Sequence, residues 1–536
     1  MTSFLKTGKY LIMLYRIHDI HLRYDEDSLQ HLKNSILQLL QLNEKDLLFF
    51  KIAKRSIDAR KKPARIVYSV DVEMAQTPLI MEAEPISENH IEKIISGKKP
   101  SHVNPIIVGA GPAGLFAGFI LAKYGYKPII LERGSDIQGR NIALDNFKKT
   151  RKPNINCNAL FGLGGAGTFS DGKLTTSLSH PFIRYILEIL VECGAPQQIL
   201  IDAKPHIGTD ILQGVVTNLA KKIESLGGII KTDTTLTNII AKNGLITKIE
   251  TSEGCLETET LIVATGLSAR DTWKILEAAG VEIAPKPFQI GIRVEHPQNW
   301  LDKQQYGEGA GHPALGASDY KVVANINKTP VFSFCMCPGG WTMPTINEPG
   351  HLCINGMSFH KREGRFSSSG IVVTLDPNIY GGKNLDSCLS FIRKIEAKCF
   401  EKGGSDYTAP AQTLNALIKG QIDKTLPETS YNFGLSPASM DDLFPGFIIE
   451  KIKEALPIFN KKLPGFIQDA AIAIAPEARA SSPVRIVRDQ ETRQSTTIKG
   501  IYPIGEGSGY AGGIMSAALD GLKSGIKIIE EFAPVS

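Results

Sequence analysis

Residues 106–132 read IIVGAGPAGLFAGFILAKYGYKPIILE, and this stretch constrains the fold more than any other part of the chain. An apolar run ends at Val108, the turn GAGPAG follows, and a second apolar run leads to an apolar segment that ends at Glu132. This pattern predicts a strand, a tight turn, a helix and a second strand. In such a unit Gly109 makes the turn, Gly111 lets the backbone approach a pyrophosphate, and Gly114 allows close helix–strand packing.

The helix that Pro112 and Ala113 open is predicted to bind phosphate at its N-terminus, where unpaired N–H groups and the helix dipole both favour an anion. Glu132 follows Gly111 by roughly the 20 residues expected of a carboxylate that binds a ribose 2′-hydroxyl. An acidic residue at this position disfavours a 2′-phosphate. FAD or NAD therefore fits the site better than NADP.

This stretch has two alternative interpretations, a membrane span and a chance match to the GxGxxG spacing, and both are weaker. Residues 103–122 are apolar enough to suggest a membrane span of about 20 residues, but three glycines and a proline stand in the centre of this segment, so we expect no membrane span. The GxGxxG spacing also recurs at 162–167 and 507–512. Neither repeat is followed by a helix, a strand and a terminal acid, so only the first has the full context.

The composition is that of an ordinary globular protein, with 42% hydrophobic and 21% charged residues and a net charge of +5 over 536 residues. Eight cysteines are scattered without a CxxC pair or a cysteine–histidine cluster at zinc-ligand spacing, so no metal site is predicted. His312, His351 and His360 likewise show no metal spacing. A reducing, cytoplasmic compartment is expected.

The length predicts three or four domain-sized units. We expect a small α+β domain at 1–98, the first part of a nucleotide-binding domain at 99–284, an inserted substrate domain at 285–465, and the returning part of the nucleotide-binding domain at 466–536. The first domain should contain strands near 20–24, 47–56 and 65–72 and a helix near 29–39 behind an Asp27 cap, with residues 97–101 as a linker. Its basic residues suit either a solvated hairpin face or RNA; they are Lys51, Lys54, Arg55, Arg60, Lys61, Lys62 and Arg65.

Further elements are predicted around this core. A loop rich in glycine, FGLGGAGTFSDGKL at 161–174, follows Arg133 and Arg140 and must bend sharply or approach a flat group. A helix capped by Asp210 should end near Leu226. Strands should deliver the small-residue turn Ala264-Thr265-Gly266 and the loop Gly505-Glu506-Gly507 to the nucleotide site, before a last helix at about 513–532.

Together these motifs resemble the glutathione-reductase-type FAD fold, in its branch with p-hydroxybenzoate hydroxylase and geranylgeranyl reductase. More closely, GGAGTFSDGKL, CMCPGG at 335–340, ARASSPVRI at 478–486 and YPIGEGSGYAGGIMSAALDG near the C-terminus resemble the uncharacterised bacterial "NAD(FAD)-utilizing dehydrogenase" family. The resemblance covers about residue 10 to the C-terminus. It implies an α/β fold with a Rossmann-like FAD-binding domain, an inserted substrate domain and the small N-terminal α+β domain.

The resemblance also implies which residues bind FAD. Gly109, Gly111, Gly114 and Glu132 would hold the ADP half, Ala264, Thr265 and Gly266 would pass near the pyrophosphate, and Gly505, Glu506, Gly512 and Gly513 would hold the ribityl chain and the flavin edge. The full expected set adds Pro112, Ala113, Arg133, Arg140 and Gly165. Much of the wider fold has Asp where this chain has Glu506.

The expected function is therefore that of an FAD-dependent oxidoreductase acting on an unidentified small molecule, with an anionic substrate as one option and NADH as a transient electron donor. Lys173, Arg293, Arg479 and Arg485 are candidates for orienting an anionic substrate or stabilising an anionic intermediate. A salt bridge is the alternative for each of them. Two other functions stay open: an RNA-associated flavoprotein that holds tRNA with its basic N-terminal domain, and a non-catalytic flavin-dependent scaffold.

The cysteines give no clear redox motif. Cys157 stands alone before the glycine-rich loop, and Cys335 and Cys337 are expected on one face of a strand. Paired burial and disulfide chemistry both fit that spacing. We favour structural cysteines.

Overall fold

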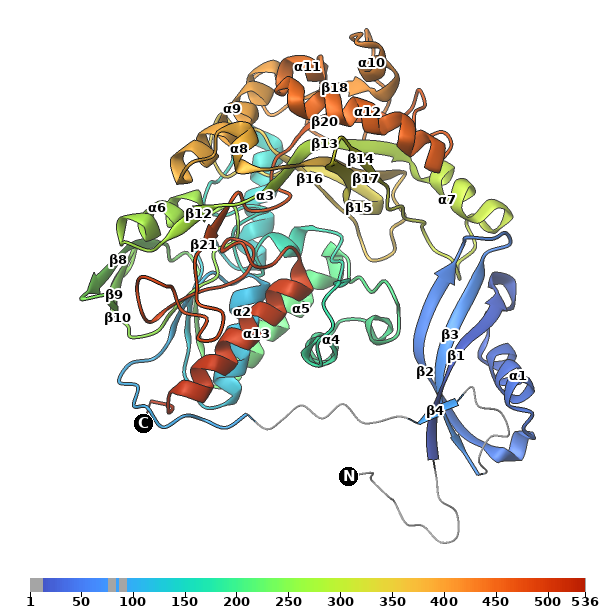
Figure 1. Ribbon diagram of the computed structural model, residues 1–536, viewed down its shortest axis with the longest axis horizontal. Helices are drawn as coiled ribbons and strands as arrows, with labels where there is room; N and C mark the ends of the chain where they lie inside the picture. Colours follow the sequence, from blue (N-terminus) through green and yellow to red (C-terminus); the bar gives the residue numbers. More distant parts are fainter. Residues whose placement is uncertain (1–12, 76–82, 86–93, 536) are drawn as a thin grey trace.

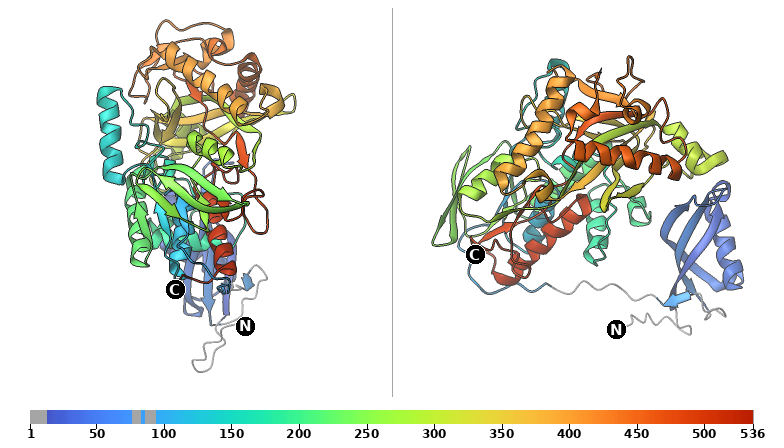
Figure 2. Two further views of the ribbon diagram at one scale, coloured as in Figure 1. Left: turned by 90° about the vertical axis from the view of Figure 1, so that its left-hand side faces the viewer. Right: turned by 45° about the horizontal axis from the view of Figure 1, so that its top comes forward.

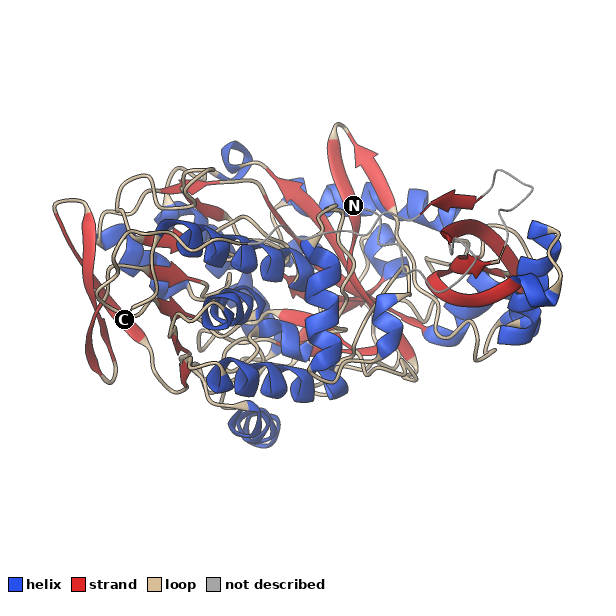
Figure 3. Ribbon diagram, turned by 90° about the horizontal axis from the view of Figure 1, so that it is seen from below, coloured by secondary structure: helices blue, strands red, loops and turns tan. Residues whose placement is uncertain are grey.

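The computed structural model describes residues 13–75, 83–85 and 94–535 (Figure 1). A small N-terminal domain stands at one end of the long axis in Figures 1 and 3, and the rest of the chain forms a parallel-sheet region and a larger sheet above it. No helix among the described residues has both the length and the apolar character needed to cross a membrane. The apolar residues 103–122 instead form a strand, the glycine turn and a helix, as predicted.

The parallel sheet has five strands in the order β22-β11-β5-β6-β7. All of its pairings are parallel, and the residues of β5, β11 and β22 are fully buried, which accounts for their continuous apolar sequences. The elements of this region are β5 (Ile106–Val108), α2 (Pro112–Lys123), β6 (Ile129–Leu131), α3 (Ile137–Thr150), α4 (Phe182–Glu192), α5 (Thr209–Ser225), β7 (Ile229–Lys231), β11 (Leu261–Val263), α6 (Arg270–Ala278), β22 (Ile501–Pro503) and α13 (Ile514–Glu531).

Glycines allow the close packing at the start of this sheet. Gly109 has φ +103°, and a Cβ there would lie 2.4 Å from the carbonyl oxygen of Ala264. A Cβ on Gly114 would lie 1.9 Å from the carbonyl oxygen of Gly109, and one on Gly521 would lie 1.9 Å from that of Ala113. Helix α2 can therefore pack directly on the glycine turn, and α13 can pack directly on α2 (Figure 1).

Along the chain, a separate three-stranded antiparallel sheet is inserted between β7 and β11. It consists of β8 (Leu236–Lys242), β9 (Leu245–Thr251) and β10 (Gly254–Glu257), and a hairpin turn at Asn243-Gly244 joins the first two. Helix α5 matches the predicted helix closely, but Asp210 does not cap it. Its carboxylate accepts a hydrogen bond from the backbone N–H of His360 instead.

The larger sheet lies above the parallel sheet (Figures 1 and 2), in the order β14-β15-β17-β13-β20-β18-β19 with β16 paired to β15. Helices α9 and α12 cover its outer side (Figure 2). Strand β20 lies beyond residue 465, so this sheet extends past the expected end of the inserted domain. Its elements are β13 (Phe288–Pro297), α7 (Gln298–Tyr306), β14 (Val323–Ile326), β15 (Thr329–Pro344), β16 (Ile354–Met357), β17 (Phe366–Leu375), α8 (Pro377–Tyr380), α9 (Leu385–Gly403), β18 (Ala409–Thr413), α10 (Leu414–Lys419), β19 (Leu435–Pro437), α11 (Met440–Leu443), α12 (Gly446–Lys462) and β20 (Ile472–Glu477).

Two connections join the larger sheet to the parallel-sheet region. The chain enters the larger sheet after β12 (Ile283–Pro285) and leaves it before β21 (Val484–Ile486), and these two short strands pair with each other antiparallel. The entry and exit segments are thus held side by side. Residues of the larger sheet are thereby kept over the parallel sheet.

In its described residues, the N-terminal domain is an antiparallel sheet of order β2-β3-β1-β4 with the α-helix α1. Ser28, not Asp27, caps that helix, because its hydroxyl accepts the N–H of His31. Asp27 instead binds Arg55, and Asp58 binds Arg60, so two of the cations considered for RNA binding are held in ion pairs. The elements are β1 (Met13–Arg23), α1 (Leu29–Leu40), β2 (Leu47–Asp58), β3 (Arg65–Met74) and β4 (Ala83–Pro85).

This domain contacts the rest of the chain far from the point where its sequence ends. The N–H of Arg55 donates to the carbonyl of Ile201 at 2.7 Å, and the N–H of Ala203 donates to the carbonyl of Arg55 at 2.8 Å. The expected linker runs along the end of α13, where Gly97 donates to Ile529 at 2.8 Å. The linker therefore returns the chain to the parallel sheet beside the C-terminus (Figure 1).

Candidate functional site

A cavity of about 370 Å³ lies between the carboxyl ends of the parallel strands, the N-terminus of α13, the glycine-rich loop and the larger sheet. In open parallel sheets this edge is where ligands bind. Most of the residues expected to bind a cofactor line the cavity: Gly109, Gly111, Pro112, Ala113, Glu132, Arg133, Gly165, Ala264, Thr265, Gly266, Gly505, Glu506, Gly512 and Gly513. Gly114 and Arg140 do not.

Glycines leave the backbone bare where it faces this cavity. A Cβ built on Gly512 or Gly266 meets no atom within 4 Å, and one on Gly111 approaches only the Cα of Gly165, at 3.9 Å. The side chains missing at these positions would occupy the cavity. The surface is therefore suited to a large ligand that contacts main-chain N–H groups directly, and it fits a dinucleotide.

The carboxylate of Glu132 lies at one end of the cavity and is almost fully buried. Its Oε1 accepts the N–H groups of Gly134 and Gly162 at 3.1 and 2.9 Å, and its Oε2 accepts that of Ala110 at 2.9 Å. A carboxylate has about four lone-pair positions. One position on Oε2 thus stays available for a hydroxyl donor, and the other contacts hold the glycine turn and the glycine-rich loop in place.

Arg140 lies beneath the glycine-rich loop and is fully buried. Its guanidinium donates to the carbonyl oxygens of Asn158, Ala159, Gly162 and Leu163. Burial lowers the pKa of Arg140 to about 10. The expectation that this side chain reaches a cofactor is corrected: its donors fix the loop, and the loop backbone faces the cavity.

Lys173 lines the cavity and is held by an acidic partner. Its Nζ lies 2.8 Å from a carboxylate oxygen of Asp171 and also donates to the carbonyl of Met336. Asp171 is buried and pairs with Arg362 as well. Lys173 is therefore a tethered cation at the cavity wall and not a free anion-binding group.

Arg293 does not line the cavity, which corrects its assignment as a substrate-orienting cation. The side chain is fully buried in β13, and its Nε donates to Glu477 at 2.7 Å. A second nitrogen donates to the hydroxyl of Ser368 at 3.1 Å and the third to Asn355 at 3.0 Å. Arg293 and Glu477 thus form a buried ion pair within the larger sheet.

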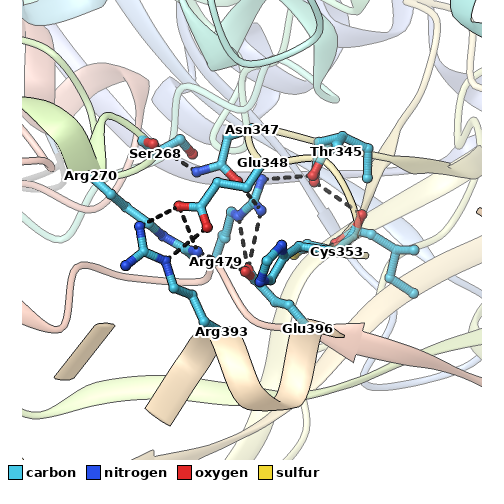
Figure 4. A network of polar contacts seen from close by, with 12 residues as sticks. Ser268, Arg270, Thr345, Asn347, Glu348, Cys353, Arg393, Glu396 and Arg479 are labelled. Carbon is cyan, nitrogen blue, oxygen red and sulfur yellow. Dashed lines mark hydrogen bonds and ion pairs between the residues drawn. The ribbon is translucent and has the colours of Figure 1, made fainter. Parts of the chain in front are cut away.

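Arg479 lines the cavity but belongs to a polar network that joins α6 to α9 (Figure 4). It pairs with Glu396 at 3.1 Å and donates to the carbonyl of Thr345 and the side-chain oxygen of Asn347, each at 2.6 Å. Arg270 binds the same carboxylate with two hydrogen bonds of 2.8 Å. Arg479 therefore forms a salt bridge, which was the alternative to a role in orienting the substrate.

Arg485 is exposed and stacks on Tyr510 outside the cavity lining.

Glu506 lines the cavity at the end of β22. Burial raises the pKa of Glu506 to about 8, and nearby Lys286 opposes this shift.

The adjacent Gly505 is positioned by Asp520, a residue that the sequence analysis did not identify. Asp520 accepts the N–H of Gly505 at 2.8 Å and pairs with Arg488. A lone carboxylate inside the apolar run AALDGL was the available sequence signal.

The two cysteines of CMCPGG differ in exposure. Cys335 is partly exposed and lines the cavity, whereas Cys337 is fully buried. The pairing of β15 with β17 shifts register between Phe334 and Cys337, so an irregularity interrupts the strand at this segment. Cys157 is buried and does not line the cavity.

Comparisons with known proteins find matches to several parts of the chain. Residues 287–480 match the family described as "FAD-dependent protein, C-terminal domain-like", residues 107–150 match an NAD(P)-binding Rossmann-like domain, and residues 15–73 match a domain of unknown function. Among solved structures, a halogenase mutant in complex with FAD aligns over 80% of this chain and 70% of its own at 12% identity, with a TM-score of 0.37. Glycine oxidase from Geobacillus kaustophilus aligns over 80% and 95% at 12% identity, with a TM-score of 0.35.

A relative with similarity along its whole length is an uncharacterised protein of Clostridium beijerinckii. It is 39% identical over 533 residues, which cover 97% of this chain and 99% of the relative. The chain belongs to one family with that protein, and it is an FAD-dependent protein with a Rossmann-like domain.

Proposed function

We propose that the chain is an FAD-dependent oxidoreductase that acts on a small molecule held beside Lys173, Cys335 and Glu506. The observation that carries this proposal is that the glycine turn, Glu132 and these three polar side chains line the same cavity. FAD, when bound, supplies the hydride chemistry, and the protein supplies binding, orientation and electrostatics. A raised pKa lets Glu506 hold a proton near neutral pH.

The glycines that line the cavity suggest which element binds which part of the cofactor. The free position on Glu132 suits a ribose hydroxyl, and the N-terminus of α2 suits the pyrophosphate. Gly512 and Gly513 would offer the N-terminus of α13 to the reducible ring. We further infer the glutathione-reductase type of FAD fold, in the branch with p-hydroxybenzoate hydroxylase. The three-stranded sheet inserted between β7 and β11 supports this inference.

NADH is the proposed electron donor, and anaerobic mixing tests the function. The yellow protein should be bleached by NADH and should recover its absorbance when oxygen or another acceptor is added. A flavin that dithionite reduces but that neither NADH nor NADPH reduces would favour the non-catalytic scaffold. Salt-dependent retention of tRNA would support the RNA-associated alternative.

Gly512→Val should lower the flavin midpoint potential while FAD stays bound. Its Cβ would project into the cavity, where no atom lies within 4 Å, and would move the ring away from the N-terminus of α13. A helix N-terminus stabilises developing negative charge by roughly 0.3–2 kcal/mol, and about 30 mV corresponds to 1.4 kcal/mol for a two-electron couple. A decrease on the order of 10–40 mV is expected in a redox titration. An unchanged potential would show that the reducible ring does not rest on the N-terminus of α13.

A further inference from the structure

The segment Cys335-Met336-Cys337 forms part of the cavity wall and has an unusual backbone. Cys335 has φ +42°, a left-handed conformation that is uncommon for a residue with a side chain. The register shift in β15 lies in the same segment. Strained, bulged backbone of this kind is frequent next to active sites, where it redirects a side chain. Here it accompanies a cysteine that reaches the cavity and a second one buried behind it.

Two cations and a thiol hold this segment in place. Lys173 donates to the carbonyl of Met336, and Arg293 donates to the carbonyl of Cys335 at 3.5 Å. The Sγ of Cys337 donates to the same Cys335 carbonyl at 3.3 Å. The two thiols are therefore close neighbours, one residue apart in sequence and fixed by contacts from two sides.

The surroundings shift the pKa values of the two thiols in opposite directions. A hydrogen bond from Cys337 and the charges of Lys173 and Arg293 lower the pKa of Cys335, although burial opposes this shift. The hydrogen bond to Cys335 and burial raise the pKa of Cys337. Because the thiolate is the nucleophilic form, Cys335 is the reactive member, and it faces the cavity. Cys337 keeps its proton until a partner accepts it.

We propose that Cys335 and Cys337 form a redox-active dithiol–disulfide couple that exchanges two electrons with the flavin cavity. On oxidation the two S–H bonds break, one S–S bond forms, two protons leave, and two electrons pass to an oxidant. The oxidant is oxidised flavin in the cavity or a small disulfide that enters it. The flavin route rests on the proposed function. The reverse reaction reduces the disulfide at the expense of reduced flavin.

The other cysteines lack this arrangement. Cys157, Cys193, Cys353, Cys388 and Cys399 are buried and do not line the cavity, and Cys255 is exposed. Cys255 is therefore a matched control, since it is a solvent-accessible thiol in β10 whose replacement should disturb neither the cavity nor the core.

Two measurements on the FAD-containing protein test the proposal. After equilibration with oxidised glutathione, alkylation and peptide mapping, the peptide with Cys335 and Cys337 should lack both thiol hydrogens and resist alkylation until dithiothreitol is added. In anaerobic dithionite titration, oxidised wild type and Cys255→Ser should each take up about four electrons per FAD, and Cys335→Ser and Cys337→Ser about two. Dithionite makes both readouts independent of whether NADH is the physiological donor.

The proposal is overturned if oxidised wild type takes up about two electrons per FAD and its Cys335–Cys337 peptide stays fully alkylated. Glutathione attached to Cys335 without an internal bond would also overturn it, because that result shows a reactive single thiol. If the serine variants do not fold, the peptide map of wild type still decides between these outcomes.

Discussion

Gly111→Val should give a folded protein that does not retain FAD. The backbone of Gly111 is extended, with φ −79°, so an L-residue adopts it without strain. Its Cβ would point into the cavity, with the Cα of Gly165 as the nearest atom at 3.9 Å. The valine methyl groups would occupy the space where a pyrophosphate meets the N-terminus of α2. Losing about two charge-assisted hydrogen bonds weakens binding by about 100-fold or more.

Flavin absorbance after gel filtration and the thermal midpoint of the apoprotein together measure this result. Gly214→Val is the matched control, because Gly214 is exposed in α5 and its Cβ also meets nothing within 4 Å. The control should keep its flavin. Gly114→Ala should instead destabilise the fold, because its Cβ would lie 1.9 Å from the carbonyl oxygen of Gly109. A Gly111→Val protein that stays fully yellow would remove the basis for placing the pyrophosphate here.

The half of the cavity formed by the parallel strands could be predicted because its determinants are local. Gly109, Gly111 and Glu132 lie within one strand–turn–helix–strand unit, and their spacing alone specifies the turn and the acid. The opposite wall comes from residues such as Cys335 and Asn355 in the larger sheet. Its position depends on sheet pairing over long sequence distances, which no local pattern encodes.

The contacts of the arginine and lysine side chains also depend on the tertiary structure, and most of them could not be predicted from local sequence. Arg140 stands before a glycine-rich loop, where a phosphate contact and a loop contact look alike in sequence, and the fold turns its guanidinium toward carbonyl oxygens. Asp171 is two residues from Lys173 and could have been considered its partner. The partner of Arg479 is Glu396, 83 residues away, and only the tertiary structure reveals it.

Glu396→Gln should destabilise the fold more than any cavity-facing change. The carboxylate is fully buried, and its partners Arg270 and Arg479 are 4% and 6% exposed. A neutral amide leaves two buried guanidinium groups without this shared counter-charge (Figure 4). Removing one member of a buried ion pair costs about 3–5 kcal/mol of unfolding free energy. Because Arg479 lines the cavity, the variant should also bind FAD less tightly.

The pH dependence of this loss distinguishes the ion pair from a packing defect. Burial opposes ionisation of Glu396, but the charges of Arg270 and Arg479 and the Arg270 hydrogen bonds outweigh it and lower the pKa of the folded state. The stabilisation is therefore present above the unfolded glutamate pKa of about 4.3 and is lost as the pH falls through the folded value. Thermal unfolding should show a large wild-type advantage at neutral pH that shrinks in acid. Glu401→Gln, an exposed change on the same helix α9, should show neither effect. A Glu396→Gln deficit that stays constant with pH would mean that packing around the side chain, and not its charge, stabilises the contact between α6 and α9.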